Sequence, residues 1–190
     1  MEAEIAAVEL PSVWAGLDLP IEVDVGCHRG TFLVAMAKLY PEQRFLGIER
    51  QPSRVERCLK KIARLNLSNA HAVQGEGLTM LRELELRARV IHVSFPDPWP
   101  KRRHHIRRMV NADFLAEAWP VIEPGGMLRL MTDDESYFSA MKQAALACPG
   151  FEPVDWEDGR TYPPTEFQMK FESKPVYRLA LRRCDSTSSE

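Results

Sequence analysis

Cysteine is scarce in this chain, and no two cysteines occur at a metal-binding or redox spacing. The four are Cys27, Cys58, Cys148 and Cys184, and no CxxC pair is present. Widely spaced cysteines are typical of reduced thiols in the cytosol, and they argue against a disulfide framework or a zinc site. We therefore expect a cytoplasmic protein without a bound metal.

The chain also lacks a long apolar run and a strong net charge. No stretch approaches the roughly 20 apolar residues that a membrane-spanning helix needs. The first ten residues are acidic, where a signal peptide would be positive. The formal net charge is only −2, so any affinity for nucleic acid must come from a local basic patch. These absences predict a protein that has no membrane partner.

Apolar runs of strand length alternate with amphipathic stretches of helix length. The predicted strands are 21–25, 44–48, 70–73, 91–95, 127–131, 151–156 and 176–182. A helical pattern follows each of the first five strands. Pro124–Gly126 predicts a turn before the fifth strand, and Glu157–Lys174 predicts a polar loop before the last one.

This alternation predicts one Rossmann-like α/β domain over residues 21–182. We expect a doubly wound, mostly parallel sheet with helices on both faces. Residues 1–20 form a segment of uncertain structure, and residues 183–190 read as a disordered tail.

The segment after the fourth predicted strand concentrates the chemically active side chains. Pro96 and Pro98 stop the strand, because each fixes φ and removes a backbone donor. Asp97 lies between them and Trp99 follows. Five of the eight residues 101–108 are Arg or Lys. Ligands of open α/β sheets bind beyond the carboxyl ends of the strands, so this segment predicts a site. The alternative is a proline-rich turn with a solvated basic face.

The first strand runs into a glycine-rich turn, and an acid ends the second strand. Glu49 lies 19 positions after the last glycine of Gly26–Gly30, close to the spacing of an acid that binds an adenosine ribose. His28 and Arg29 occupy positions where a pyrophosphate would need bare backbone, which disfavours NAD and FAD. S-adenosylmethionine carries no phosphate, and its cationic groups suit an acid such as Asp24. The alternative is a strand–turn–helix that binds no ligand.

Together these segments resemble the tRNA (guanine-N7)-methyltransferase family, which belongs to the class I S-adenosylmethionine-dependent methyltransferases. The motifs that carry the resemblance are PDPWPKRRHHIRR at 96–108, GIE at 47–49, PGG at 124–126, TD at 132–133, TEF at 165–167 and PVYRL at 175–179. The first motif is the specific one. The resemblance spans about residues 21–182 and implies methyl transfer from S-adenosylmethionine to N7 of a variable-loop guanosine in tRNA.

The resemblance also implies the roles of individual residues. The implied cofactor-binding residues are Asp24, Gly26, Gly30, Glu49, Glu76 and Asp97. The implied substrate-binding residues are Lys101, Asp133, Thr165, Glu166, Phe167 and Gln168. Three positions depart from the family pattern: His28 stands where a glycine is common, Glu76 replaces a shorter acid, and Gln168 replaces a glutamate.

Methylation of guanine N7 needs no general base, because N7 already has a free lone pair. Catalysis should therefore consist of positioning and electrostatic stabilisation of a product that carries positive charge. Asp97 is the candidate catalytic carboxylate. Trp99 could stack on a base or pack in the core. The candidate RNA-phosphate contacts, besides Lys101, are Arg102, Arg103, Arg107 and Arg108.

Other functional classes remain open at this point. His104 and His105 have no nearby Cys or acid at ligand spacing, which argues against a metal site. Cys27 could be a nucleophile, but its place in a turn favours a buried filler. A non-catalytic RNA-binding protein on a methyltransferase fold, or a nicotinamide-dependent oxidoreductase, would use the same elements. The sequence does not indicate the oligomeric state.

Overall fold

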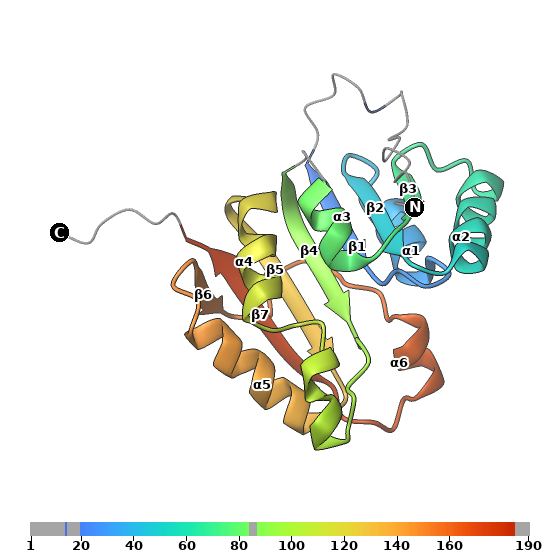
Figure 1. Ribbon diagram of the computed structural model, residues 1–190. Helices are drawn as coiled ribbons and strands as arrows, with labels where there is room; N and C mark the ends of the chain where they lie inside the picture. Colours follow the sequence, from blue (N-terminus) through green and yellow to red (C-terminus); the bar gives the residue numbers. More distant parts are fainter. Residues whose placement is uncertain (1–13, 15–19, 84–86, 185–190) are drawn as a thin grey trace, which may run out of the picture.

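A single seven-stranded sheet organises the part of the chain that the computed structural model describes, which is residues 14, 20–83 and 87–184. The strand order is β3-β2-β1-β4-β5-β7-β6 (Figure 1). The strands are β1 (Ile21–Val25), β2 (Arg44–Glu49), β3 (Ala70–Gln74), β4 (Ala88–Ser94), β5 (Ile122–Thr132), β6 (Phe151–Val154) and β7 (Tyr177–Arg183). The first five are parallel, and β7 runs antiparallel to β5 and β6.

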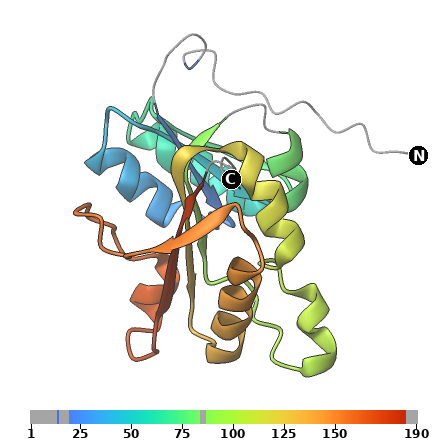
Figure 2. The same cartoon turned by 90° about the vertical axis from the view of Figure 1, so that its left-hand side faces the viewer.

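Helices cover both faces of the sheet, as predicted. Figure 2 shows the sheet edge-on, with α1 and α6 on one side and α3, α4 and α5 on the other. The helices are α1 (Thr31–Leu39), α2 (Pro52–Arg64), α3 (Gly77–Glu83), α4 (Ala112–Val121), α5 (Glu135–Leu146) and α6 (Glu166–Lys170). Among the described residues, we find no helix with the length and apolar character of a membrane span.

The central strands β1, β2 and β4 are buried along most of their length, because a parallel sheet covered by helices leaves no solvated side. β1 has the sequence IEVDV and is buried along its whole length. Its valines point toward α4 and α5 with the apolar residues of β4 and β5. On the opposite face, Phe45 of β2 packs with residues of α1 and α2 such as Met36 and Ile62.

The direction in which successive strands are added to the sheet reverses between β1 and β4. From β1 the chain continues to β2 and β3 on one side, and from β4 it continues to β5 on the other side. A switch point of this kind leaves a crevice outside the carboxyl ends of the two strands. The turn after β1 and the proline-rich segment after β4 therefore start side by side.

Strand β5 begins at Ile122, five residues before the predicted start at Met127. The ladder with β4 pairs Ala88 with Ile122 and then Val90 with Met127. The Pro-Gly-Gly segment therefore lies inside the strand as an irregularity, with Gly125 at φ 73°, and does not separate two elements. At the other end of the chain, β7 reaches Arg183, and residues 185–190 lie outside the described part.

The predicted polar loop between β6 and β7 contains a helix, α6, and the basic segment contains a short 3-10 helix, η2 (Arg102–Arg107). Thr165 Oγ1 accepts a hydrogen bond from Gln168 N, and the Gln168 side chain accepts one from Thr165 N. This is a capping box. The pattern Thr-x-x-Gln was visible in the sequence and could have predicted the helix.

A buried polar cluster anchors the chain that leads into α6. The Arg129 guanidinium of β5 lies between the rings of Trp156 and Tyr162, 3.9 Å from each centroid. Arg160 forms an ion pair of 2.7 Å with the buried Glu22 of β1. Buried charges persist when they are paired or stacked in this way, so residues 156–162 are fixed against the sheet.

Candidate active site

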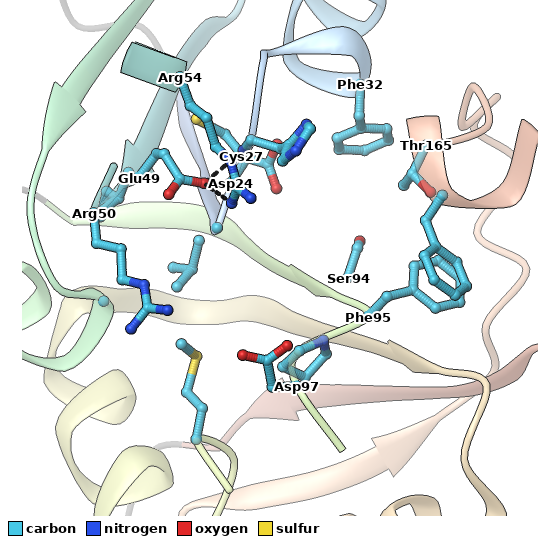
Figure 3. A pocket seen from close by; sticks show the side chains of 18 of the residues that line it. Asp24, Cys27, Phe32, Glu49, Arg50, Arg54, Ser94, Phe95, Asp97 and Thr165 are labelled. Atoms are coloured by element: carbon cyan, nitrogen blue, oxygen red, sulfur yellow. Dashed lines mark hydrogen bonds and ion pairs between the residues drawn. The ribbon is translucent and has the colours of Figure 1, made fainter. Parts of the chain in front are cut away.

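A cavity of about 730 Å³ opens at the switch point. Its walls are the turn after β1, the end of β2, the loop after β3, the segment after β4, η2 and α6. Figure 3 shows Asp24 and Glu49 at one end of the cavity, Phe95 and Thr165 at another, and Asp97 facing inward. The volume suits a ligand of drug or cofactor size.

Glu49 is held rigidly at the carboxyl end of β2. Its carboxylate accepts hydrogen bonds from the backbone N–H groups of His28, at 3.1 Å, and Gln51, at 2.9 Å. Arg54 Nη1 lies 3.6 Å from Glu49 Oε2. The side chain is buried but lines the cavity. A carboxylate fixed in this way has lone pairs left for two hydroxyl groups of a ligand.

Asp24, near the end of β1, is a second buried acid on the same cavity. Burial and the nearby Glu49 carboxylate raise the pKa of Asp24 to about 7. Both effects disfavour its charged form. A cationic ligand group would reverse this balance, so the environment of Asp24 fits an ammonium or sulfonium group.

Gly26 and Gly30 of the first turn are required for different structural reasons. Gly26 has φ 80° and open space where a Cβ would lie, and it lines the cavity. Gly30 has φ 68°, and a Cβ there would lie 2.2 Å from Cys58 Sγ. Gly30 does not line the cavity. Packing against α2 accounts for the glycine at this position, and its predicted cofactor contact stays a prediction.

Asp97 reaches the cavity from a strained turn. Phe95 and Trp99, on either side of it, have φ 53° and 46°, a region that large side chains rarely adopt. Strained backbone of this kind clusters at functional sites. Asp97 is exposed and Trp99 is half-buried, and both line the cavity. Trp99 is therefore not a core residue.

The basic segment divides into exposed and buried arginines. Arg102, Arg103 and Arg107 are exposed, and Arg107 lies over the Trp99 ring at 5.0 Å. Arg108 is only 6% exposed. Its guanidinium donates to the backbone oxygen of Pro98 at 2.9 Å and to Ser136 Oγ at 3.1 Å.

Arg108 also lies 3.7 Å from Asp134 and over the Tyr137 ring. These contacts hold the Arg108 guanidinium against the protein, although the residue also lines the cavity, so its predicted contact with RNA phosphates stays a prediction. Its position at the end of a 3-10 helix turns its side chain inward, and it ties the active-site segment to α5.

Among the substrate-binding residues that the sequence suggests, three line the cavity, and they are Thr165, Glu166 and Phe167. Lys101, Asp133 and Gln168 do not. Lys101 is exposed before η2. Asp133 pairs with Lys174 at 2.6 Å, and the Gln168 side chain is engaged in the capping box of α6. Glutamine and glutamate serve equally in that motif, so the departure at this position preserves the local fold. Glu76 is exposed and lines the cavity.

Several residues that line the cavity were missed from the sequence. The sequence did not indicate Arg54 as a site residue, because it lies inside α2, three residues after the N-cap of the helix, and not at the end of a strand. Phe95 was read as a core strand residue, whereas its ring stacks on Phe167 of α6 with centroids 4.5 Å apart. Ile106 is 89% exposed at the rim, and its only sequence signal is that it interrupts a basic run.

Cys27 is a buried thiol in contact with Cys58. A hydrogen bond with Cys58, together with burial, raises the pKa of Cys27 well above its ordinary value. A thiol held protonated is a poor nucleophile, which favours the role of a buried filler. Within the described residues, no cluster of three or more His, Cys, Asp or Glu side chains is placed to hold a metal ion.

Known proteins are similar to this chain in sequence and in architecture. The chain matches a family model described as "Putative methyltransferase" over residues 18–179. A tRNA (guanine-N(7)-)-methyltransferase of Thermosynechococcus vestitus is 36% identical over 172 residues, which cover 87% of this chain and 81% of that protein. The protein of the same name from Microcystis aeruginosa is 34% identical over 191 residues, covering 94% and 90%.

Solved structures agree on the fold. The antibiotic-resistance methyltransferase Kmr superimposes with a TM-score of 0.65 at 21% identity, over 92% of this chain and 91% of that one. At this identity the likeness concerns the class I methyltransferase architecture alone. The sequence relatives are closer and span nearly the whole chain. The chain therefore belongs to the tRNA (guanine-N(7)-)-methyltransferase family.

Proposed function

We propose that this protein transfers a methyl group from S-adenosylmethionine to N7 of a guanosine in tRNA. The observation that carries the proposal is the placement of two buried acids, Asp24 and Glu49, on the same cavity as Asp97. Family membership supports the same reaction, because the curated relatives bear that name.

The residues at the β1–β2 end of the cavity fit the cofactor. Glu49 would accept the ribose hydroxyls, and Asp24 would pair with the ammonium group of the methionine portion. Gly26 leaves the space in which a ligand could approach the backbone. When bound, S-adenosylmethionine supplies an electrophilic methyl group on a sulfonium sulfur. The side chains of His28 and Arg29 crowd the turn that a dinucleotide's pyrophosphate would need, which disfavours the oxidoreductase alternative.

Asp97 would act on the guanine without removing a proton. Its carboxylate can accept hydrogen bonds from the N1–H and N2–H groups of the base, which orients N7. The same negative charge stabilises the positive charge that develops on the ring as the methyl group arrives. Trp99, at the rim, offers an aromatic face for a base that has left its stack.

The exposed arginines of η2 would hold the RNA by its phosphates. Arg102, Arg103 and Arg107 are exposed and, with Lys101, form a cationic segment that follows Asp97 in the chain, and Arg107 lines the cavity. Phosphate contacts position a nucleic acid without reading its sequence, so the choice of guanosine must depend on the cavity.

The decisive experiment incubates the purified protein with unmodified tRNA and labelled S-adenosylmethionine, and maps the labelled base. We expect label at N7 of one guanosine. Calorimetry with S-adenosylmethionine and with NADH runs alongside. Binding of tRNA without binding of S-adenosylmethionine would support a non-catalytic RNA-binding protein, and binding of NADH alone would support the oxidoreductase.

A further inference from the structure

His28 has a backbone conformation that its side chain disfavours. It lies in the middle of the first turn with φ 53°, in the left-handed region that glycine adopts most readily. A non-glycine residue keeps such a conformation only where the surrounding structure holds it. The side chain of His28 therefore has a partner that compensates.

That partner is Glu166, the first residue of α6, which is 138 positions away in the sequence. His28 Nδ1 lies 3.0 Å from Glu166 Oε2, and Arg29 Nη1 lies 3.5 Å from Glu166 Oε1. Burial raises the pKa of Glu166, but the hydrogen bond with His28 and the charges of His28 and Arg29 outweigh it and lower the pKa below its ordinary value. Glu166 is thus an anion held by two residues of the first turn.

The contact connects the two functional ends of the cavity. On one side, the backbone N–H of His28 donates to Glu49 Oε2, the carboxylate that we assign to the cofactor ribose. On the other side, Phe167 follows Glu166 and stacks on Phe95, two residues before Asp97. A continuous series of contacts therefore runs from the cofactor end to the catalytic segment.

We propose that His28 and Glu166 form a clasp that couples cofactor binding to the docking of the target guanosine. Both act as positioning residues, and the inference rests on the proposed function. A ligand on Glu49 would favour the turn geometry in which His28 holds α6, so that Thr165 and Phe167 are in place for the base. Coupling between two sites is reciprocal, so bound tRNA should tighten the cofactor site by the same factor.

The test measures the affinity for S-adenosylhomocysteine, which cannot react, with and without saturating unmodified tRNA. In the wild-type protein we expect tRNA to tighten binding by about two- to tenfold, which corresponds to one hydrogen bond. His28→Gly and Glu166→Ala should each abolish this enhancement, and the double variant should behave like either single one. An enhancement that survives in His28→Gly, or is absent in the wild type, overturns the clasp.

His28→Gly is a suitable variant, because glycine relieves the strained φ and keeps the backbone N–H that donates to Glu49. The matched control is Asn66→Gly, which replaces another non-glycine residue at positive φ, 51°, in the turn after α2 and outside the cavity. The control should keep the full enhancement.

A second measurement does not depend on the cofactor or the reaction. Amide hydrogen exchange of residues 166–171, in the protein without ligands, should be faster in His28→Gly than in the wild type and unchanged in Asn66→Gly. Unchanged exchange in His28→Gly overturns the clasp. If the wild type binds no S-adenosylhomocysteine at all, the proposed function fails and the coupling fails with it, whereas a wild type that binds S-adenosylhomocysteine without a tRNA enhancement overturns the clasp alone.

Discussion

The rings of Phe95 and Phe167 stack with centroids 4.5 Å apart and planes inclined by 24°. Phe95 directly follows β4 in the segment that leads to Asp97, and Phe167 belongs to α6, so the stack joins the catalytic segment to a helix from a distant part of the chain. Phe95 adopts φ 53°, and the stack supplies a reason for this strain to persist.

Phe167→Leu should therefore lower kcat/KM for tRNA by about two- to tenfold, because an aromatic pair contributes about 0.5–1.5 kcal/mol beyond its buried area. The affinity for S-adenosylmethionine should not change. Phe138→Leu is the control, since Phe138 stacks on Tyr177 at the same inclination of 24° and neither residue lines the cavity. Equal losses of kcat/KM in both variants would show that the effect is general destabilisation.

Glu49→Ala should weaken S-adenosylmethionine binding by about ten- to a hundredfold. The expected loss is roughly 1.5–3 kcal/mol, the contribution of a hydrogen bond to a charged group. Glu56→Ala, which removes an exposed acid paired with Lys60 on α2, should bind normally in calorimetry. Unchanged affinity in a folded Glu49→Ala variant would exclude the ribose assignment.

The raised pKa of Asp24, about 7, predicts that cofactor affinity depends on pH. Below pH 7 the carboxyl is protonated, and a cationic ligand must displace that proton, so affinity should fall by up to about tenfold per pH unit. Calorimetry between about pH 6 and pH 8, in buffers of different ionisation enthalpy, should detect the released proton. Asp24→Asn should bind weakly at every pH, and a wild-type affinity that is flat with pH would contradict the assignment.

The raised pKa of Asp24 also makes the stability of the ligand-free protein depend on pH. Stability should fall as pH rises, whereas cofactor affinity should increase. Folded Asp24 keeps its proton up to about pH 7, whereas in the unfolded chain it loses the proton near its ordinary value of about 3.9. The folded state therefore binds more protons between these values. This group's contribution to the free energy of unfolding should fall as pH rises from about 4 to about 7, and Asp24→Asn should remove that fall in denaturation curves measured across the range.

Replacing Arg102, Arg103 and Arg107 with Gln should weaken tRNA binding and flatten its salt dependence. Each lost phosphate contact should reduce the slope of log affinity against log salt by roughly 0.7–0.9. Arg108→Gln should behave differently: its thermal stability should fall, because the buried partners of Arg108 lose their donor, while the salt slope of the folded protein should stay near that of the wild type.

The fold and the outline of the site could be predicted because both depend on where strands end. Hydrophobic patterning locates β1, β2 and β4, and parallel strands bring their carboxyl ends together, which places Glu49 and Asp97 on one cavity. Directions of side chains within irregular segments could not be predicted. Charge alone does not distinguish the exposed Arg107 from the buried Arg108, because the turn of a 3-10 helix decides which one points inward.

Contacts between segments that are distant in the sequence also could not be predicted. The need for glycine at residue 30 comes from Cys58 on α2, and the partner of His28 lies 138 positions away. Neither relationship leaves a local pattern in the sequence. The capping box of α6, in contrast, could have been predicted, because Thr165 and Gln168 are three residues apart and form a local sequence pattern.

Asp97→Asn gives the sharpest test of the mechanism. The amide keeps the shape of the segment between Pro96 and Pro98 but removes the negative charge, and it presents donors where the guanine edge also presents donors. Loss of a preorganised electrostatic contact lowers turnover by about a hundred- to a thousandfold. Single-turnover methylation should therefore slow by this factor, while S-adenosylmethionine affinity falls much less and tRNA affinity, which depends mostly on phosphates, barely changes.

Asp133→Asn is the matched comparison for Asp97→Asn, because Asp133 follows β5, pairs with Lys174 and does not line the cavity. Its single-turnover rate should stay within about threefold of the wild type, as expected for a partly exposed ion pair worth less than 1 kcal/mol. The wild-type rate should show no requirement for a general base that titrates near neutral pH, since N7 gives up no proton. If Asp97→Asn turned over normally and Asp133→Asn did not, the catalytic carboxylate would be Asp133, and the cavity would have to extend past Lys174 in the complex.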